Sequence, residues 1–144
     1  MFKYDKDEQG IGTVTLDLPD AQFNILSEKH FADFEALLDK LASTDEGLKG
    51  LIIISGKADN FIVGADIKDF LKHETVEATT NVSRVGQRIL RKIAQLPFPT
   101  VAAINGACMG GGTELVLNCR ARIITDHPDS SISLPEVNLG LLPG

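Results

Sequence analysis

The part of the chain that decides the fold reads TVAAINGACMGGGTELVLNC over residues 100–119. It opens on a short apolar run at residues 100–104, which is typical of a buried strand. The dipeptide at 105–106 turns the chain, and the glycines at 110–112 lead into a helix predicted at about residues 113–119. A strand that passes through a glycine-rich turn into a helix indicates an α/β fold.

The segments before and after this unit continue the alternation of strands and helices. A strand is predicted at residues 11–18, where apolar and polar residues alternate, and another at the continuous apolar run 51–54. Apolar residues recur at helical spacing over 31–41, after the capping residue Ser27, and over 82–96, before two prolines. Shorter elements are predicted at 66–71 (helix), 122–125 and 131–134 (strands), with loops at 55–64 and 138–144 and a loop or helix start at 72–80.

Length and composition narrow the class of protein. The chain has 144 residues, which suits one domain, and no apolar run reaches the ~18–20 residues that a membrane span requires. A net charge of −6 argues against nucleic-acid binding, which needs a basic surface. The first seven residues lack the apolar stretch of a signal peptide, so an intracellular protein is predicted. The cysteines (Cys108, Cys119) and the three histidines are not spaced as metal ligands.

The glycine cluster at 110–112 is a candidate ligand site. Glycines let the backbone turn tightly and approach a ligand, and the first amides of a helix lack partners and carry partial positive charge. Such amides bind a phosphate or stabilise an oxyanion, although a tight turn without any ligand explains the glycines equally well. Neither GxxxxGK[ST] nor GxGxxG is present, so the common phosphate motifs are not matched.

Two carboxylates strengthen this candidate. Glu114 follows the glycines on the first turn of an otherwise apolar helix, and Glu136 follows Pro135 after a short strand. Each has an ordinary explanation, because the helix dipole favours an acid at the first turn and Glu136 alone would be a surface residue. Together with the glycine turn, the pair suggests acid/base chemistry.

Three motifs resemble blocks of the crotonase (enoyl-CoA hydratase/isomerase) superfamily, in that family's order and spacing. They read FIVGADI at 61–67, AAINGACMGGGTEL at 102–115 and ISLPEVNLGLLPG at 132–144. Residues 55–66 look most like the hydratase region of the multifunctional alpha subunits of fatty-acid β-oxidation. The resemblance implies a ClpP/crotonase-type fold, a superhelix of ββα units, with residues 1–144 forming its N-terminal core. It also implies hydration of trans-2-enoyl-CoA to 3-hydroxyacyl-CoA.

The resemblance carries roles to individual residues. The backbone amides of Ala65 and Gly111 would form an oxyanion hole for the thioester carbonyl, and Glu114 and Glu136 would hold the water that adds to the double bond. The presence of both glutamates favours hydration over other reactions of the superfamily. Coenzyme A, as part of the substrate, would cross the loop near Ala65, and neither a metal nor a redox cofactor is expected. Candidate contacts to it are Val63, Asp66, Ile67, Lys57 and Lys68, the two lysines being equally consistent with solvated side chains.

Other readings stay open from the sequence alone. The chain could be a Δ3–Δ2 enoyl-CoA isomerase, another crotonase-type enzyme, or a fragment that binds acyl-CoA without turnover. The family's domain continues beyond the point where this chain stops, into C-terminal helices that cover the acyl pocket and build trimers. We therefore expect weak or no hydration by these 144 residues alone. In a full-length form, the expected partners are copies of itself or other subunits of a fatty-acid oxidation complex, in the cytoplasm or, in a eukaryote, the mitochondrial matrix.

Overall fold

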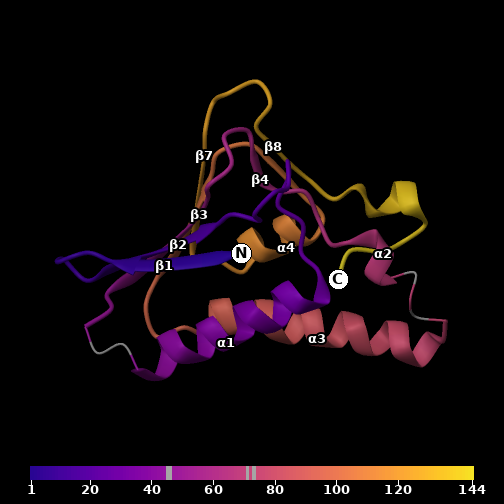
Figure 1. Ribbon diagram of the computed structural model, residues 1–144, viewed down its shortest axis with the longest axis horizontal. Helices are drawn as coiled ribbons and strands as arrows, with labels where there is room; N and C mark the ends of the chain where they lie inside the picture. Colours follow the sequence, from indigo (N-terminus) through magenta and orange to yellow (C-terminus); the bar gives the residue numbers. More distant parts are fainter. Residues whose placement is uncertain (45–46, 71, 73) are drawn as a thin grey trace.

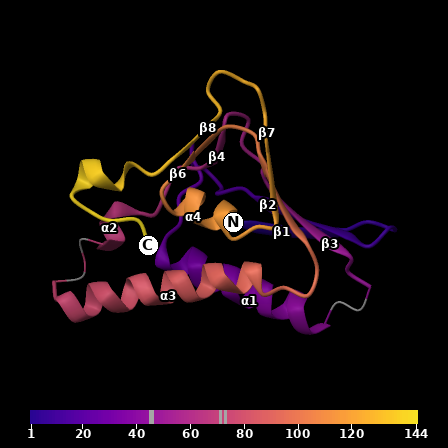
Figure 2. The same cartoon turned by 180° about the vertical axis from the view of Figure 1, so that it is seen from behind.

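The computed structural model describes residues 1–44, 47–70, 72 and 74–144, so Leu71 of the predicted short helix and His73 lie outside the described residues. Two sheets lean against each other above two long helices. A short helix lies in the space that the sheets and the long helices enclose (Figures 1 and 2). The strands are β1 (Phe2–Lys6), β2 (Ile11–Leu16), β3 (Gly50–Ser55), β4 (Asn60–Ile62), β5 (Thr100–Ile104), β6 (Ala107–Met109), β7 (Ala121–Ile124) and β8 (Ser131–Ser133). The helices are α1 (Glu28–Thr44), α2 (Ile67–Phe70), α3 (Val76–Ala94), α4 (Gly111–Leu117) and the 3₁₀ helix η1 (Pro135–Leu139).

The larger sheet has the strand order β1-β2-β3-β5-β7. Its first pair is antiparallel and the other pairs are parallel, so β2, β3, β5 and β7 all end at one edge. The smaller sheet, β4-β6-β8, is parallel throughout. Strand order and helix placement agree with the α/β class predicted from the sequence.

The long helices α1 and α3 lie side by side at the base of the molecule (Figure 1). Their apolar faces point into the core, where Phe34 and Leu38 of α1 and Ile93 of α3 are almost completely buried. Across the outer surface Lys92 bonds Glu35 at 2.8 Å and Asp39 at 2.6 Å. These exposed ion pairs add little stability compared with the buried apolar faces.

The starts of both long helices follow the expected chemistry. The Ser27 hydroxyl lies 3.4 Å from the His30 amide at the first turn of α1, which agrees with its predicted capping role. The Thr75 hydroxyl accepts a 3.1 Å bond from the Ala78 amide at the start of α3. Among the described residues, no helix is both long enough and apolar enough to cross a membrane.

Several local predictions were wrong. The predicted loop 55–64 contains β4, and the unpredicted strands β1 and β6 lie at the N-terminus and just before the glycine cluster. Helix α4 begins at Gly111, two residues before the predicted start, so Gly111 and Gly112 already belong to its first turn. The predicted loop 138–144 overlaps the end of η1. The three-residue strands β4 and β6 exist through pairing with each other, which a run of three residues cannot reveal locally.

Candidate functional site

The turn from β6 into α4 sets the amide of Gly111 at the first position of the helix. Gly110 caps the helix with φ +52° and ψ −123°, a conformation that side chains disfavour. Its own N–H donates a 3.0 Å bond to the Ser133 carbonyl, which ties the turn to β8. Gly112 lies so close to β4 that an added Cβ would stand 2.5 Å from the Ile62 carbonyl oxygen. The glycines are therefore required both for the turn and for the approach of α4 to β4.

Ala65 lies opposite this turn, in the segment that follows β4. It forms an isolated parallel bridge with Leu26, closed by the Leu26 amide bonding Gly64 and by the Asp66 amide bonding Leu26, each at 2.9 Å. In such a bridge the N–H of the middle residue points to the other side. In the part of the chain that the structure describes, the amides of Ala65 and Gly111 donate to no acceptor.

The two free amides lie near each other. A Cβ built on Gly111 would stand 3.8 Å from the Ala65 nitrogen, and nothing but glycine leaves that space open. Two nearby N–H groups that have no acceptor among the described residues, one of them at a helix N-terminus, are suited to bind an oxygen that develops negative charge. The sequence-predicted oxyanion residues are thus brought together.

Glu114 lies one turn into α4 and is half-buried. Its Oε1 accepts a 2.7 Å hydrogen bond from the Gly144 amide. No role was predicted for Gly144, because a glycine in an irregular segment carries no signal for which side chain it meets. The contact joins the end of the chain to the first turn of α4.

Glu136 approaches the same turn from η1. Its Oε1 lies 2.9 Å from the position that a Cβ on Gly110 would occupy, so this carboxylate covers the glycine. Its Oε2 is buried and has no hydrogen-bond partner among the described residues. Buried carboxylate oxygens are normally satisfied, so an oxygen of this kind is suited to contact a water or a substrate. Glu136 therefore covers the glycine turn from η1, while Glu114 follows that turn on α4.

Thr113 joins these elements and was not singled out from the sequence. Its hydroxyl lies 2.7 Å from the Ser133 carbonyl and 3.1 Å from the Cys108 carbonyl, and the side chain is 3% exposed. Because β8 leads directly into η1, this contact couples the turn that carries Glu114 to the segment that carries Glu136. The sequence signal that could have identified this residue is a threonine within the first turn of an otherwise apolar helix.

The other predicted contacts lie in and around the Ala65 loop. Val63 is half-buried and its amide bonds the Asn24 carbonyl at 2.9 Å, while Asp66 is half-buried next to Ala65. Ile67 begins α2 and is 54% exposed, as an apolar ligand contact requires. Lys68 belongs to α2, and its side chain lies outside the described part of the structure.

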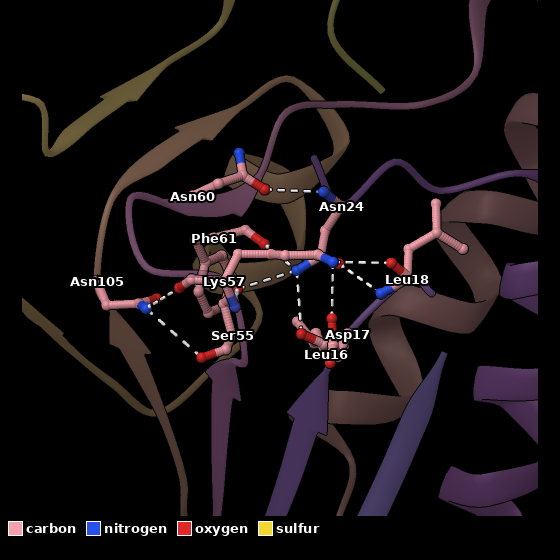
Figure 3. Close-up of polar contacts among 9 residues, drawn as sticks. All are labelled: Leu16, Asp17, Leu18, Asn24, Ser55, Lys57, Asn60, Phe61 and Asn105. Carbon is pink, nitrogen blue, oxygen red and sulfur yellow. Dashed lines mark hydrogen bonds and ion pairs between the residues drawn. The ribbon is translucent and has the colours of Figure 1, made fainter. Parts of the chain in front are cut away.

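Lys57 makes contacts within the chain. Its ammonium nitrogen lies 2.8 Å from Oδ1 of Asp17 and donates a 2.8 Å bond to the Leu18 carbonyl (Figure 3). The hydrogen bond from Lys57 lowers the pKa of the Asp17 carboxyl. The side chain thus ties the segment after β2 to the segment after β3, and its predicted contact to a phosphate would compete with these bonds.

The two cysteines are buried in the core, at 0% and 5% exposure for Cys108 and Cys119. Burial raises the pKa of each thiol to about 11, so both are neutral near pH 7. Neutral buried thiols behave as small apolar groups and are poor nucleophiles. Within the described ranges, no three His, Cys, Asp or Glu side chains are grouped as metal ligands would be.

The chain is similar to several known proteins over almost its whole length. The chain is 41% identical over 143 residues to the fatty acid oxidation complex subunit alpha of Aliivibrio fischeri, covering 99% of this chain and 21% of that protein. It is likewise 41% identical to the subunit of the same name from Idiomarina loihiensis, of which it covers 20%. The fold matches the crystal structure of an enoyl-CoA hydratase from Bacillus anthracis with a TM-score of 0.87 and 27% identity, over 99% of this chain and 54% of that one.

The chain therefore spans about a fifth of these relatives and about half of this solved hydratase. The likeness to that structure identifies the fold as crotonase-like, as the sequence motifs predicted. The model of the family described as enoyl-CoA hydratase/isomerase matches residues 6–144. With nearly its whole length matched, the chain belongs to the enoyl-CoA hydratase/isomerase family.

Proposed function

We propose that this chain carries the site for adding water to a trans-2-enoyl-CoA, giving a 3-hydroxyacyl-CoA. The observation that carries the proposal is a turn that brings Ala65 close to Gly111, whose amides have no acceptor among the described residues, with Glu136 over Gly110 and Glu114 on the helix that follows. The Ala65 nitrogen lies 3.8 Å from the Cβ position of Gly111, and Glu136 lies over Gly110. Family membership and the 41% identity to fatty acid oxidation subunits support the choice of substrate class.

The amides act on the thioester carbonyl. Hydrogen bonds from Ala65 and Gly111 polarise the C=O, which makes the β-carbon of the conjugated double bond electrophilic. When water adds there, negative charge moves to the carbonyl oxygen as an enolate, which the same two N–H groups stabilise. Loss of one such donor typically slows an enzyme by ~10²–10³.

The carboxylates act on the water. The water oxygen forms a bond to the β-carbon while one of its protons passes to a carboxylate, and a proton delivered to the α-carbon completes the addition. No group is oxidised or reduced overall, so the reaction requires no redox cofactor. Either Glu114 or Glu136 could serve as the base. The buried Oε2 of Glu136 supports a role in contact with the water.

The test is hydration of crotonyl-CoA, followed by the loss of the conjugated-thioester absorbance. We expect Glu114→Gln and Glu136→Gln each to lower kcat by about 10²–10⁴, the range of a general acid–base contribution. Asp129→Asn serves as the matched control and should retain activity, because this exposed carboxylate lies beside His127 in the segment between β7 and β8. Hydration that persists in both glutamine variants would refute the mechanism.

The same variants separate the alternatives. A Δ3–Δ2 isomerase moves a proton between two carbons and can work with one base, so a variant that isomerises a 3-enoyl-CoA without hydrating crotonyl-CoA favours isomerisation. Calorimetric binding of acyl-CoA without any product would indicate a binding fragment. The comparison uses this chain and any longer form in which these residues occur, because the chain spans about half of a solved hydratase.

A further inference from the structure

Asn24 is a completely buried polar residue whose side-chain groups are all bonded. Its Oδ1 accepts a 2.9 Å bond from the Leu18 amide (Figure 3). Its Nδ2 lies within 2.9–3.0 Å of the Leu16 carbonyl, the Ser55 hydroxyl and the Phe61 carbonyl, so two hydrogens serve three acceptors. One side chain thus holds together the segments at the ends of β2 and β3 and within β4.

The backbone of Asn24 begins a short segment, residues 24–26, that is hydrogen-bonded to the Ala65 loop. The Asn24 amide bonds Oδ1 of Asn60 at 2.8 Å, and its carbonyl accepts from the Val63 amide at 2.9 Å. Two residues later, Leu26 bonds the residues on both sides of Ala65. Residues 63–66 therefore run along residues 24–26, and this pairing determines where the Ala65 N–H points.

Residues 24–26 also lie against Gly111, the second amide donor. The Cδ1 atom of Leu26 lies 3.9 Å from the Cβ position of Gly111, and Leu26 is only 2% exposed. A displacement of residues 24–26 would therefore move the Ala65 amide, because the two segments are hydrogen-bonded. It would also change the packing beside Gly111, because Leu26 lies next to it.

We propose that Asn24 is a positioning residue for the amide pair: its side chain anchors residues 24–26 to the sheet, and that segment holds the Ala65 N–H beside Gly111. A buried amide in a satisfied network resists displacement, since any broken bond leaves a buried polar group without a partner. The geometric part of this proposal stands without any assigned reaction. Its consequence for catalysis rests on the function proposed above.

The primary test is Asn24→Asp, followed by amide NMR and hydrogen exchange of the whole chain. The substitution preserves size and directs a carboxylate oxygen, in place of two N–H donors, at the carbonyls of Leu16 and Phe61. We expect the Ala65 amide resonance to shift. We also expect the amides of Val63, Leu26 and Asp66 to lose protection by roughly tenfold or more, relative to the amides that pair β3 with β5.

The chain offers a matched control in Asn105→Asp. The Asn105 Nδ2 donates a 2.6 Å bond to the Lys57 carbonyl at the same edge of the sheet, but it bonds no residue of 24–26 or 63–66 (Figure 3). This variant undergoes the same change from an amide to a carboxyl group, and it should leave the Ala65 amide resonance unshifted. Equal effects of the two substitutions on Ala65, or no effect of Asn24→Asp, would overturn the proposal.

Should Asn24→Asp not fold, native-state exchange on the unmodified chain decides the question. The Leu18 amide reports the Asn24 side chain directly, because it donates to Oδ1. We expect it to open in one step with the amides of Val63, Leu26 and Asp66 as denaturant is raised. A Leu18 amide that stays protected while those three exchange through a separate opening would contradict anchoring by Asn24.

Activity provides a separate readout. With crotonyl-CoA as substrate, Asn24→Asp should lower kcat by about 10- to 100-fold with a smaller change in KM, because a misplaced donor weakens transition-state stabilisation most. Asn105→Asp should change kcat much less. If neither the unmodified chain nor any longer form in which these residues occur hydrates crotonyl-CoA, the proposed function fails, whereas the amide measurements still decide whether Asn24 positions Ala65.

Discussion

The Gly144 amide donates a 2.7 Å hydrogen bond to Oε1 of Glu114, which joins residues 30 positions apart in the sequence. The contact gives the two carboxylates different surroundings, since Oε2 of Glu136 is buried with no hydrogen-bond partner among the described residues. A carboxylate oriented by a backbone N–H is held in one direction, whereas an unsatisfied oxygen is available to a water. This asymmetry supports a division of work between the two glutamates.

Replacing Gly144 with proline should test the orienting bond, because proline has no N–H. Hydrogen bonds to charged groups contribute about 1.5–3 kcal/mol, so in a form long enough to hydrate crotonyl-CoA, Gly144→Pro should lower the rate roughly 10- to 100-fold. Gly144→Ala keeps the donor, and its Cβ would stand 3.3 Å from both Glu114 oxygens, which requires only a small adjustment. A steady-state assay with crotonyl-CoA that finds equal losses in both variants would show that the bond has no orienting role.

Replacing glycine with alanine should change the free energy of unfolding in opposite directions at Gly110 and at Gly86. At Gly110 an added Cβ would stand 2.9 Å from Oε1 of Glu136, and φ is +52°. We expect Gly110→Ala to lower the free energy of unfolding by about 1–3 kcal/mol. Gly86 lies inside α3 with no atom within 4 Å of a built Cβ, so Gly86→Ala should raise stability by about 0.5–1 kcal/mol. Urea unfolding of both variants checks this, and destabilisation by Gly86→Ala would show that the helix carries a constraint not visible in its contacts.

The central unit of the fold could be read from the sequence because its signals are local. An apolar run, a glycine turn and a second apolar segment directly predict β5 and α4, and the motifs around Ala65 and Glu136 identify the residues that meet there. The strands β4 and β6 could not be read, since each is three residues long and gains its hydrogen bonds from a partner far along the chain.

The anchoring network illustrates the same limit at the level of single residues. Asn24 bonds Ser55 and Phe61, 31 and 37 positions away, and nothing near Asn24 in the sequence marks it as buried. An asparagine between a strand and a helix normally indicates a turn. Its role becomes visible only when the ends of the parallel strands are brought to one edge of the sheet.

Lys57→Met should separate a structural lysine from a ligand contact. The variant keeps the apolar stem and removes the charge that bonds Asp17, so the free energy of unfolding should fall at pH 7. The pKa of Asp17 is lowered by Lys57, so its contribution is present above the unfolded value of 3.8 and is lost as pH falls through the folded pKa. The difference in unfolding midpoint between the variant and the unmodified chain should therefore shrink in acid, leaving the part due to the Leu18 bond.

The same variant tests the predicted phosphate contact. Because the Lys57 ammonium already bonds Asp17 and the Leu18 carbonyl, we expect calorimetric affinity for coenzyme A to change less than threefold, roughly the effect of one exposed charge in salt. Asp17→Asn, which breaks the ion pair from the other side, is the matched control for stability. A large loss of affinity in Lys57→Met with none in Asp17→Asn would restore the lysine as a ligand contact.

The buried thiols make stability fall in alkaline solution. Burial raises the pKa of Cys108 and Cys119 from 9.0 to about 11, so the folded state holds these protons where the unfolded state releases them. Their contribution is complete below pH 9 and is lost as pH rises towards 11, by roughly 2–3 kcal/mol for each thiol. Urea unfolding from pH 8 to 11 measures the decline, with the Cys108→Ala/Cys119→Ala double variant as the reference for all other titrating groups. Because alanine cannot ionise, the double variant should be less stable at pH 8 but should lose less stability by pH 11, and parallel curves for the two proteins would show that the thiols titrate alike in both states.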